Sequence, residues 1–245
     1  MRKLMTLSVM LCLFFLPSFA EGELTITYLG HSCFTITAGG GTVVMIDPYD
    51  EYLPYPALPK PADVVLVTHE HLDHNAVARV QGNPTVVRGL DDKGNVVEEE
   101  RTVKAIPIES IAASHGPGRG NTALFAFVID GVRFAHLGDI ATVLSTKQAE
   151  ALSDVEVLFI PAGGIATIDA SKAVTVVESL PSVRVVIPMH YFVPNYCPWP
   201  FDPVDTFLDT AEANWPVLHK GVSQVSLSKE TLPEETEVWV LDFER

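Results

Sequence analysis

The stretch Thr68-His69-Glu70-His71-Leu72-Asp73-His74 follows directly on the apolar run Val64–Val67 and is the most informative part of the chain. Five of the six residues from His69 to His74 carry side chains that bind metal ions. Without a metal, imidazoles and carboxylates packed at this density would be crowded or buried with no partner. The stretch therefore indicates a metal site rather than a solvated loop that happens to be rich in histidine.

The spacing within this stretch indicates two ions. His69 and His71 are two residues apart, so on an extended segment their side chains point the same way. Asp73 and His74 follow after the chain turns and can face a second ion. The helical H-E-x-x-H metal motif is excluded, because Asp73 occupies the position four residues after His69.

Three hydrophobic runs place metal-binding side chains at the same kind of position. His69, Asp139 and His190 each lie just beyond the end of an apolar run. In α/β folds ligands collect at the carboxyl ends of strands, so one site can draw on several strands. The sequence thus predicts a single site that is built from distant segments.

Short β-branched runs alternate with helical stretches along the chain. We expect strands at residues 24–29, 34–38, 42–46, 64–67, 85–88, 103–106, 122–129, 132–136, 155–160, 183–187, 222–227 and 237–241, and helices at 75–81, 146–152, 170–180 and 203–213. Asp169 and Asp202 stand at expected helix N-caps, and Asp130-Gly131 is a hairpin signal. Two similar halves, 24–120 and 121–245, predict an α/β protein, a four-layer αββα sandwich of two mixed β-sheets flanked by helices.

The arrangement His-x-His-x-Asp-His at residues 69–74 is the signature of the metallo-β-lactamase fold superfamily, which this chain resembles. The other expected pieces occur in the expected order: Asp47 at the end of an early strand, then His115, then Asp139 after a glycine, then His190 after a strand. The resemblance covers nearly all of residues 21–245. It implies a metal-dependent hydrolase with the αββα fold.

Within that superfamily the chain looks most like the branch that contains the ascorbate-phosphate lactonase and many uncharacterised metal-dependent hydrolases. The features that carry this likeness are Leu29-Gly30-His31-Ser32-Cys33-Phe34, Asp47-Pro48, Pro161-Ala162-Gly163-Gly164 and Ile187-Pro188-Met189-His190-Tyr191. The loop 48–61 departs from the pattern, with five prolines and three tyrosines, and its role stays open. Substrate identity does not carry over with a fold.

The resemblance implies a complete set of ligands for two ions. His69, His71 and His115 would hold the first ion, Asp73, His74 and His190 the second, and Asp139 would bridge the two. Such a pair of divalent ions would hold a bridging hydroxide as nucleophile, so Asp139, which joins the ions, and Asp73, which could orient the hydroxide, count as catalytic. Zinc suits an imidazole-rich site, while manganese and iron are compatible with the same ligand types.

Three further residues are expected to contact the ligands without binding the ions themselves. His31 lies in a turn that the resemblance places near the metals, and Asp47 is expected to support the histidine loop. His136 lies three residues before Asp139. For both histidines a buried structural role is the alternative, whereas His219 is expected to be structural or on the surface.

The first twenty residues read as a signal peptide rather than as part of the folded domain. Arg2 and Lys3 precede an apolar stretch at 4–16, and Ser18-Phe19-Ala20 offers the small residues of a cleavage site. We expect cleavage after residue 20, a hydrolase domain at 21–245 and an exported protein, periplasmic or secreted. An uncleaved membrane anchor is the alternative, and the mature domain is not expected to insert stably into a membrane.

The charge of the chain bears on its partners. It has 16 basic and 31 acidic residues, and removal of residues 1–20 takes away two of the basic ones, which makes the balance still more negative. Nucleic-acid binding needs clustered Lys and Arg, so an acidic surface argues against it. A small-molecule substrate is expected, and the oligomeric state stays open.

The sequence predicts an exported dinuclear hydrolase that acts on a small lactone, ester or phosphodiester. The alternatives are a β-lactam-hydrolysing enzyme and a non-catalytic metal-binding protein on the same fold. Cys33 and Cys197 are the cysteines of the expected mature domain. In an oxidising compartment they could form one disulfide, but their separation cannot be read from the sequence.

Overall fold

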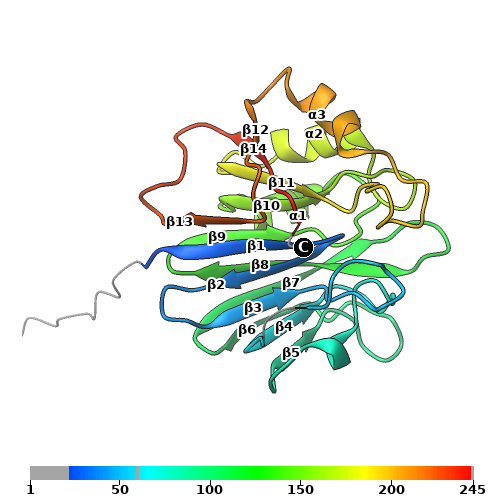
Figure 1. Cartoon of the computed structure of the whole chain (residues 1–245), viewed down its shortest axis with the longest axis vertical. Helices are drawn as coiled ribbons and strands as arrows, with labels where there is room; N and C mark the ends of the chain where they lie inside the picture. Colours follow the sequence, from blue (N-terminus) through cyan, green and yellow to red (C-terminus); the bar gives the residue numbers. More distant parts are fainter. Residues whose placement is uncertain (1–21, 59–60, 244–245) are drawn as a thin grey trace, which may run out of the picture.

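The computed structural model describes residues 22–58 and 61–243. The expected signal peptide at 1–20 lies outside the described residues. Two β-sheets pack face to face in the rest of the chain (Figure 1). Among the described residues, no helix is both long enough and apolar enough to cross a membrane.

The first sheet has six strands in the order β13-β1-β2-β3-β4-β5. Their bounds are Leu24–Gly30 (β1), Cys33–Thr37 (β2), Val43–Ile46 (β3), Val64–Val67 (β4), Thr85–Arg88 (β5) and Gln224–Leu227 (β13). The strands β1, β2 and β3 pair antiparallel, whereas β3, β4 and β5 pair parallel. This sheet is therefore mixed, and its β13 comes from the far end of the chain.

The second sheet has eight strands in the order β12-β14-β11-β10-β9-β8-β7-β6. Their bounds are Glu99–Val103 (β6), Ile106–Ser114 (β7), Asn121–Ile129 (β8), Val132–His136 (β9), Val157–Pro161 (β10), Val185–Met189 (β11), Val217–His219 (β12) and Glu237–Val240 (β14). The strands β6 to β9 pair antiparallel, whereas β9, β10, β11 and β14 pair parallel. The expected fold class of two mixed sheets is confirmed.

Apolar side chains fill the space between the sheets. The ring of Phe34 on β2 lies 4.4 Å from that of Phe159 on β10, centroid to centroid. Phe127 and Phe134 stack beside them at 5.3 Å. Burial of such large aromatic side chains holds the two sheets together.

Helices cover the outer face of the eight-stranded sheet. They are α1 (Thr146–Ala151), α2 (Ala170–Glu178) and α3 (Val204–Ala211), and α2 and α3 lie beside β11 and β14 in Figure 1. Val176 of α2 and Phe207 of α3 are fully buried in one cluster with Val186 of β11. The side chain of Asp169 accepts a hydrogen bond from the Lys172 N–H, as the expected N-cap of α2 should.

Two expected elements are wrong. The helix expected at 75–81 is only a three-residue 3-10 turn, Val77–Arg79, because its N–H groups bond carbonyls three residues back and Val80 is already extended. The strand expected at 103–106 is a hairpin turn between β6 and β7, with Lys104 and Ala105 in the left-handed region at φ 52° and 65°. Such a turn usually carries Asn or Gly, and neither residue is present here to signal it.

Three smaller expectations concerned a helix N-cap, a hairpin and a disulfide. Pro203, not Asp202, is the N-cap residue of α3, because the backbone of Asp202 is engaged with Gly163 and Phe192. The hairpin at Asp130-Gly131 is confirmed, since Ile129 pairs with Val132 across it. Both cysteines are buried and free, so no disulfide joins Cys33 to Cys197.

The loop 48–61 packs on the body of the protein over most of its described part. The Tyr49 hydroxyl donates to the Leu29 carbonyl at 3.0 Å. The Tyr55 ring lies against Gly30, where a Cβ would come within 2.4 Å of it, and Gly30 has a φ of 110°. Gly30 is thus required both by the backbone and by the close approach of the ring. Of the three tyrosines of this loop, Tyr49 and Tyr55 are buried and Tyr52 is exposed.

Candidate metal centre

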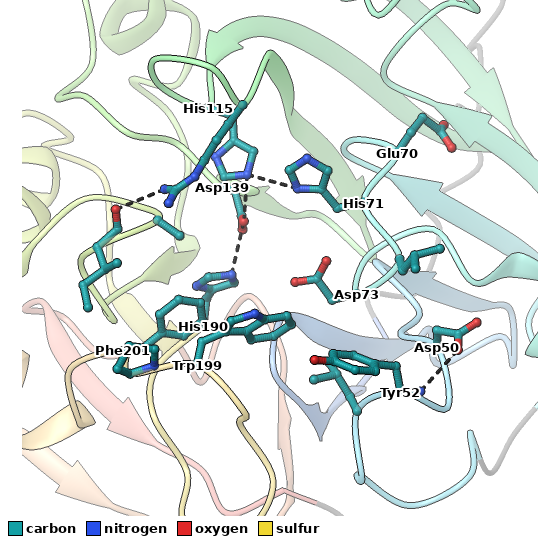
Figure 2. Close-up of a pocket in the computed structure, with 16 residues that line it drawn as sticks. Asp50, Tyr52, Glu70, His71, Asp73, His115, Asp139, His190, Trp199 and Phe201 are labelled. Atoms are coloured by element: carbon teal, nitrogen blue, oxygen red, sulfur yellow. Dashed lines mark hydrogen bonds and ion pairs between the residues drawn. The ribbon is translucent and has the colours of Figure 1, made fainter.

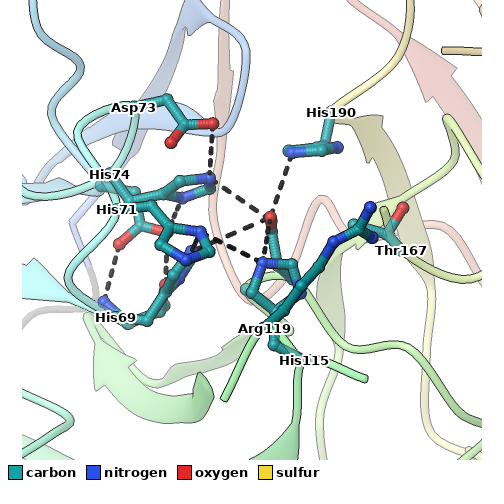
Figure 3. Close-up of polar contacts among 12 residues, drawn as sticks. His69, His71, Asp73, His74, His115, Arg119, Thr167 and His190 are labelled. Carbon is teal, nitrogen blue, oxygen red and sulfur yellow. Dashed lines mark hydrogen bonds and ion pairs between the residues drawn. The ribbon is translucent and has the colours of Figure 1, made fainter. Parts of the chain in front are cut away.

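The metal-binding side chains meet at one edge of the sandwich. His69 to His74 follow β4, His115 follows β7, Asp139 follows β9 and His190 follows β11. Figure 3 shows these side chains directed toward one another from separate loops. The structure therefore brings together all seven of the expected ligands, and His31 from the turn between β1 and β2 joins them.

The first cluster consists of His69, His71 and His115, whose nearest ring nitrogens lie within 4.8 Å of one another. The Nε2 of His69 is 3.1 Å from the Nδ1 of His71, and the Nε2 of His115 is 3.3 Å from that same Nδ1. Nitrogen ligands about 2.0–2.1 Å from one tetrahedral ion lie roughly 3.3–3.4 Å apart. The spacing of the three imidazoles therefore suits a shared cation.

The second cluster consists of His31, Asp73, His74 and His190. The Oδ2 of Asp73 lies 3.5 Å from the Nε2 of His74 and 3.0 Å from the Nε2 of His31. An Nε2–H of His31 that donates to Asp73 would not be free to bind an ion. His31 is thus placed to orient Asp73, although it also lies close enough to Asp73, His74 and His190 to share a metal ion with them.

Asp139 lies between the two clusters. Its Oδ2 is 3.3 Å from the Nε2 of His115 and 3.1 Å from the Nε2 of His190 (Figure 2), while its Oδ1 is 3.4 Å from the Nε2 of His74. Its carboxylate thus contacts ligands of both clusters. This is the placement that a bridging carboxylate requires.

Five buried side-chain atoms of the site have no hydrogen-bond partner within the described part of the chain, one each in His31, His74, His115, Asp139 and His190. The Nε2 of His74 and the Oδ1 of Asp139 are both shielded from solvent and accept or donate no hydrogen bond. Leaving a buried polar atom unpaired costs about 1–3 kcal/mol. A divalent cation would satisfy both atoms, so the residues present fit a metal centre.

Asp47 fixes the orientation of His74 from behind. Its Oδ2 accepts from the His74 Nδ1–H at 2.8 Å and from the Thr68 hydroxyl at 2.7 Å, and its Oδ1 accepts from the Thr68 N–H at 2.8 Å. With its Nδ1 protonated, His74 turns the lone pair of Nε2 toward the cavity. Asp47 therefore contacts a ligand without facing the cavity, as expected.

His136 braces the loop that carries Asp139. Its Nε2–H donates to the Ser32 carbonyl at 3.0 Å, and its Nδ1 accepts from the Gly138 N–H at 3.2 Å. Gly138 has a φ of 49°, and a Cβ there would come within 2.5 Å of the Thr122 Oγ1. Only glycine suits this position, which aims Asp139 at the two clusters.

The backbone is strained where the second cluster forms. His31 and His190 both have positive φ, at 55° and 54°. The His190 N–H donates to the His31 carbonyl at 2.9 Å, and the Tyr28 hydroxyl donates to the same carbonyl at 3.0 Å. Residues held in this region cluster at functional sites, where the surroundings enforce the conformation.

Burial and charge set the protonation of the site. Burial lowers the pKa of His31 to about 4 and that of His69 to about 3, so both rings are neutral near pH 7. Burial works against ionisation of Asp139, yet His190 and His74 hold its pKa well below the usual value. Burial likewise opposes the charging of His74, but the negative charges of three aspartates, Asp139 first, raise its pKa well above the ordinary value. The centre thus combines neutral His31 and His69 with an ionised Asp139 in a shielded place, and the negative charge that holds a proton on His74 is the charge that a cation would neutralise.

A cavity of about 490 Å³ opens onto the centre (Figure 2). Among the residues that line it are Asp73, His71, His115, Asp139 and His190 from the clusters. The rest of its wall includes Tyr52, Leu72, Arg119, Ile165, Trp199 and Phe201. A centre open to a cavity of this size is typical of catalytic rather than structural metal sites.

Several lining residues were missed in the sequence analysis. Arg119 follows His115 in a loop rich in glycine, and Trp199 and Phe201 stand in a proline-rich stretch. Neither stretch carries a motif, so only the folded structure relates them to the centre. His219 lies on β12 and lines no part of this cavity, whereas Tyr191 is buried and lies 6.5 Å from the ring of Tyr28.

The family model of the β-lactamase superfamily domain matches residues 25–190, about two thirds of the chain. The chain belongs to this superfamily. A UPF0173 metal-dependent hydrolase of Methanoculleus marisnigri is 32% identical over 185 residues, covering 68% of this chain and 80% of the relative. Together the family and these relatives establish a metal-dependent hydrolase.

Solved structures agree with this assignment. A protein of Thermotoga maritima, described as a candidate Zn-dependent hydrolase of the metallo-β-lactamase superfamily, shares 30% identity with a TM-score of 0.72, covering 90% of this chain and all of that one. The metallo hydrolase Igni18 of Ignicoccus hospitalis, at 21% identity and a TM-score of 0.56 over 78% of this chain and 91% of its own, shares the fold.

Proposed function

We propose that this hydrolase is dinuclear and that it acts on a small lactone, ester or phosphodiester. The observation that carries the proposal is the carboxylate of Asp139, which contacts both clusters and has one buried oxygen that accepts no hydrogen bond. His69, His71 and His115 would hold one ion, and Asp73, His74 and His190 the other. We assign zinc on ligand type, and manganese or iron would suit the same ligands.

When bound, the ions supply a water nucleophile of lowered pKa and polarise the scissile carbonyl or phosphoryl oxygen. The protein's own groups position the reactants around them. Asp73 lines the cavity, and its Oδ2 already accepts from His31. Its Oδ1 is left to orient the attacking water and to accept a proton from it. Burial opposes the ionisation of Asp73, but the charge of His74 and then the hydrogen bond from His31 lower its pKa, so the carboxylate is held in place and ionised.

A substrate panel tests this proposal. The purified metal-replete protein is assayed with a γ-lactone, an aryl ester, an aryl phosphodiester and a cephalosporin. We expect turnover of at least one of the first three, abolished by a chelator and restored by zinc or manganese. Turnover of the cephalosporin alone would contradict the substrate class, and activity that survives full removal of metal would contradict the mechanism.

We also propose that residues 1–20 are cleaved and that the domain works outside the cytoplasm. The support is the order of basic, apolar and small residues at the start of the chain. N-terminal sequencing of the protein from its native host tests this, with Glu21 as the expected first residue. Mature cytoplasmic protein that still begins with Met1 would contradict it.

A further inference from the structure

We propose that the cavity binds an amphiphilic anion, a substrate with a carboxylate or phosphate group held by Arg119 and an apolar chain lying along Tyr52 and Ile165. This inference rests on the proposed function, because it names the substrate class of that same site. The inference goes beyond the proposed function because it predicts which part of a substrate each wall of the cavity contacts.

The mouth of the cavity is apolar. Tyr52, Leu72 and Ile165 are 64%, 66% and 61% exposed, and all three line the cavity. The described part of the chain has six exposed large hydrophobic side chains, and the three most exposed of them line this cavity. They come from three separate loops, so their meeting is not a matter of sequence neighbourhood. Exposed apolar groups that cluster at a concave site indicate contact with an apolar ligand.

A row of aromatic rings leads from this mouth to the metal centre. Trp199 lies 6.1 Å from Tyr52 and 5.5 Å from Phe201, centroid to centroid. Phe201 in turn stacks on the expected ligand His190 at 4.6 Å (Figure 2). An apolar chain laid on these rings would have its reactive group near the clusters and its free end at the exposed mouth.

Arg119 is the positively charged residue of this wall. No other Lys or Arg lines the cavity among the described residues, and no described carboxylate lies within ion-pairing distance of Arg119. By contrast, Glu70 of the same cavity is paired with Arg88 at 2.7 Å. In a chain with a net charge of −15, a guanidinium left unpaired beside a cavity is suited to bind an anion from solution.

The backbone holds Arg119 and the apolar mouth together. The Nη1 of Arg119 donates to the Ile165 carbonyl at 3.0 Å, which leaves its other N–H groups for a ligand. Ile165 has a φ of 53°, an unfavourable conformation that costs a β-branched residue roughly 1–2 kcal/mol. This strain turns an isoleucine side chain outward at the mouth while its carbonyl fixes the guanidinium. Strain of this kind persists where function requires it.

Calorimetric titration of the metal-replete protein with four small probes tests the inference. Hexyl phosphate and hexanoate carry both an anion and a chain, methyl phosphate lacks the chain, and 1-hexanol lacks the charge. We expect at least one of the first two to bind ten-fold more tightly than either partial probe. The tighter binder of these two probes shows whether the cavity prefers a phosphate or a carboxylate. Because hexyl and methyl phosphate meet any metal ion alike, their difference reports the apolar wall alone.

Two variants assign the effect to the named residues. Arg119→Gln should weaken binding of the anionic amphiphile about ten-fold and leave 1-hexanol unchanged, whereas Tyr52→Ser should reduce the preference for hexyl over methyl phosphate. Arg101→Gln is the matched control, since Arg101 is exposed on β6 and paired with Glu99. Unchanged affinity for the anionic amphiphile in Arg119→Gln, or failure of both hexyl phosphate and hexanoate to bind more tightly than the partial probes, would overturn the inference. Absence of bound metal would defeat the proposed function instead, and elemental analysis detects that separately.

Discussion

Single hydrogen bonds from residues behind the expected ligands decide which ring nitrogen of a histidine is free to bind an ion. Asp47 is an example, because its Oδ2 holds the Nδ1–H of His74 at 2.8 Å and so leaves Nε2 free for an ion. Nothing in the sequence near Asp47 revealed that bond, since the two residues are 27 positions apart. The resemblance to the superfamily implied that a carboxylate at the end of an early strand would support the histidine loop.

Asp47→Asn is therefore expected to weaken metal binding about 10- to 100-fold, as loss of such a supporting carboxylate does. The amide presents a weaker acceptor to His74 and can rotate its NH₂ toward it. Chelator competition measures the affinity. Asp130→Asn is the matched control, because that carboxylate accepts from the Gly39 N–H in a hairpin far along the chain. Equal metal affinity in Asp47→Asn and the control would refute this role.

The strain at Ile165 predicts an unusual response to glycine. An exposed residue replaced by glycine usually costs about 0.5–1 kcal/mol through the entropy of the unfolded chain. At Ile165, relief of the left-handed strain offsets that cost, so we expect Ile165→Gly to leave the free energy of unfolding unchanged or to raise it by up to about 1 kcal/mol.

Urea denaturation measures this effect. Val143→Gly serves as the control, because Val143 is 42% exposed and is not among the residues with positive φ. We expect the control to lose stability. A loss at Ile165→Gly as large as that at Val143→Gly would show that the conformation carries no strain.

At the scale of elements, the accuracy of the sequence reading followed the strength of local signals. The buried strand at Val64–Val67 and the parallel strands β10 and β11 are runs of β-branched and apolar residues, and their expected positions were close to those observed. The turn at Lys104 and Ala105 adopts a left-handed conformation without the residues that favour it, so it was mistaken for strand. The expected helix near Ala76 is a single 3-10 turn, because the chain is already extended at Val80.

The N-cap of α2 yields a prediction with a defined pH dependence. Hydrogen bonds from the Lys172 side chain, its backbone N–H and Ser171 lower the pKa of Asp169 to about 2. Because the folded pKa lies below the unfolded value, this carboxylate stabilises the protein fully above about pH 4, and the effect is lost as the pH falls toward 2. Asp169→Ala should cost about 1 kcal/mol at pH 6.

Urea denaturation at pH 6 and pH 3 checks this expectation. The difference between wild type and Asp169→Ala should shrink at the lower pH. Asp169→Asn retains an acceptor without a titratable charge, so its own difference from Asp169→Ala should not vary with pH. A cost of Asp169→Ala that stays the same at both pH values would contradict the assigned pKa.

At the scale of the whole molecule, the sandwich and the group of ligands could be predicted because both depend on repeating rules. Strand periodicity indicates the sheets, ligand spacing and strand ends indicate one metal site, and the resemblance to the superfamily implied the complete set of ligands. The cavity could not be predicted, since Tyr52, Arg119 and Trp199 come from loops that meet only in the folded protein. The role of the loop 48–61 was open for the same reason. In the structure the Tyr55 ring of this loop packs against the rings of Tyr49 and Phe243.

The assembled site predicts which histidines matter for turnover. His71→Ala and His190→Ala should each lower kcat/KM by several orders of magnitude on any substrate found, since each removes a ligand of one cluster. His219→Ala is the control, because that side chain lies on β12 outside both clusters. Steady-state kinetics on folded variants, checked by circular dichroism, decide the matter. Near wild-type activity of His71→Ala or His190→Ala would rule out these roles.

The metal content of wild type and Asp139→Asn tests the central claim most directly. Asp139 contacts both clusters, so an amide there should weaken both sites at once. We expect elemental analysis after mild purification and zinc loading to give about two ions per wild-type chain and fewer than one in Asp139→Asn, with Asp130→Asn unchanged. A wild-type protein that takes up no transition metal, or an Asp139→Asn variant that keeps both ions, would contradict the account.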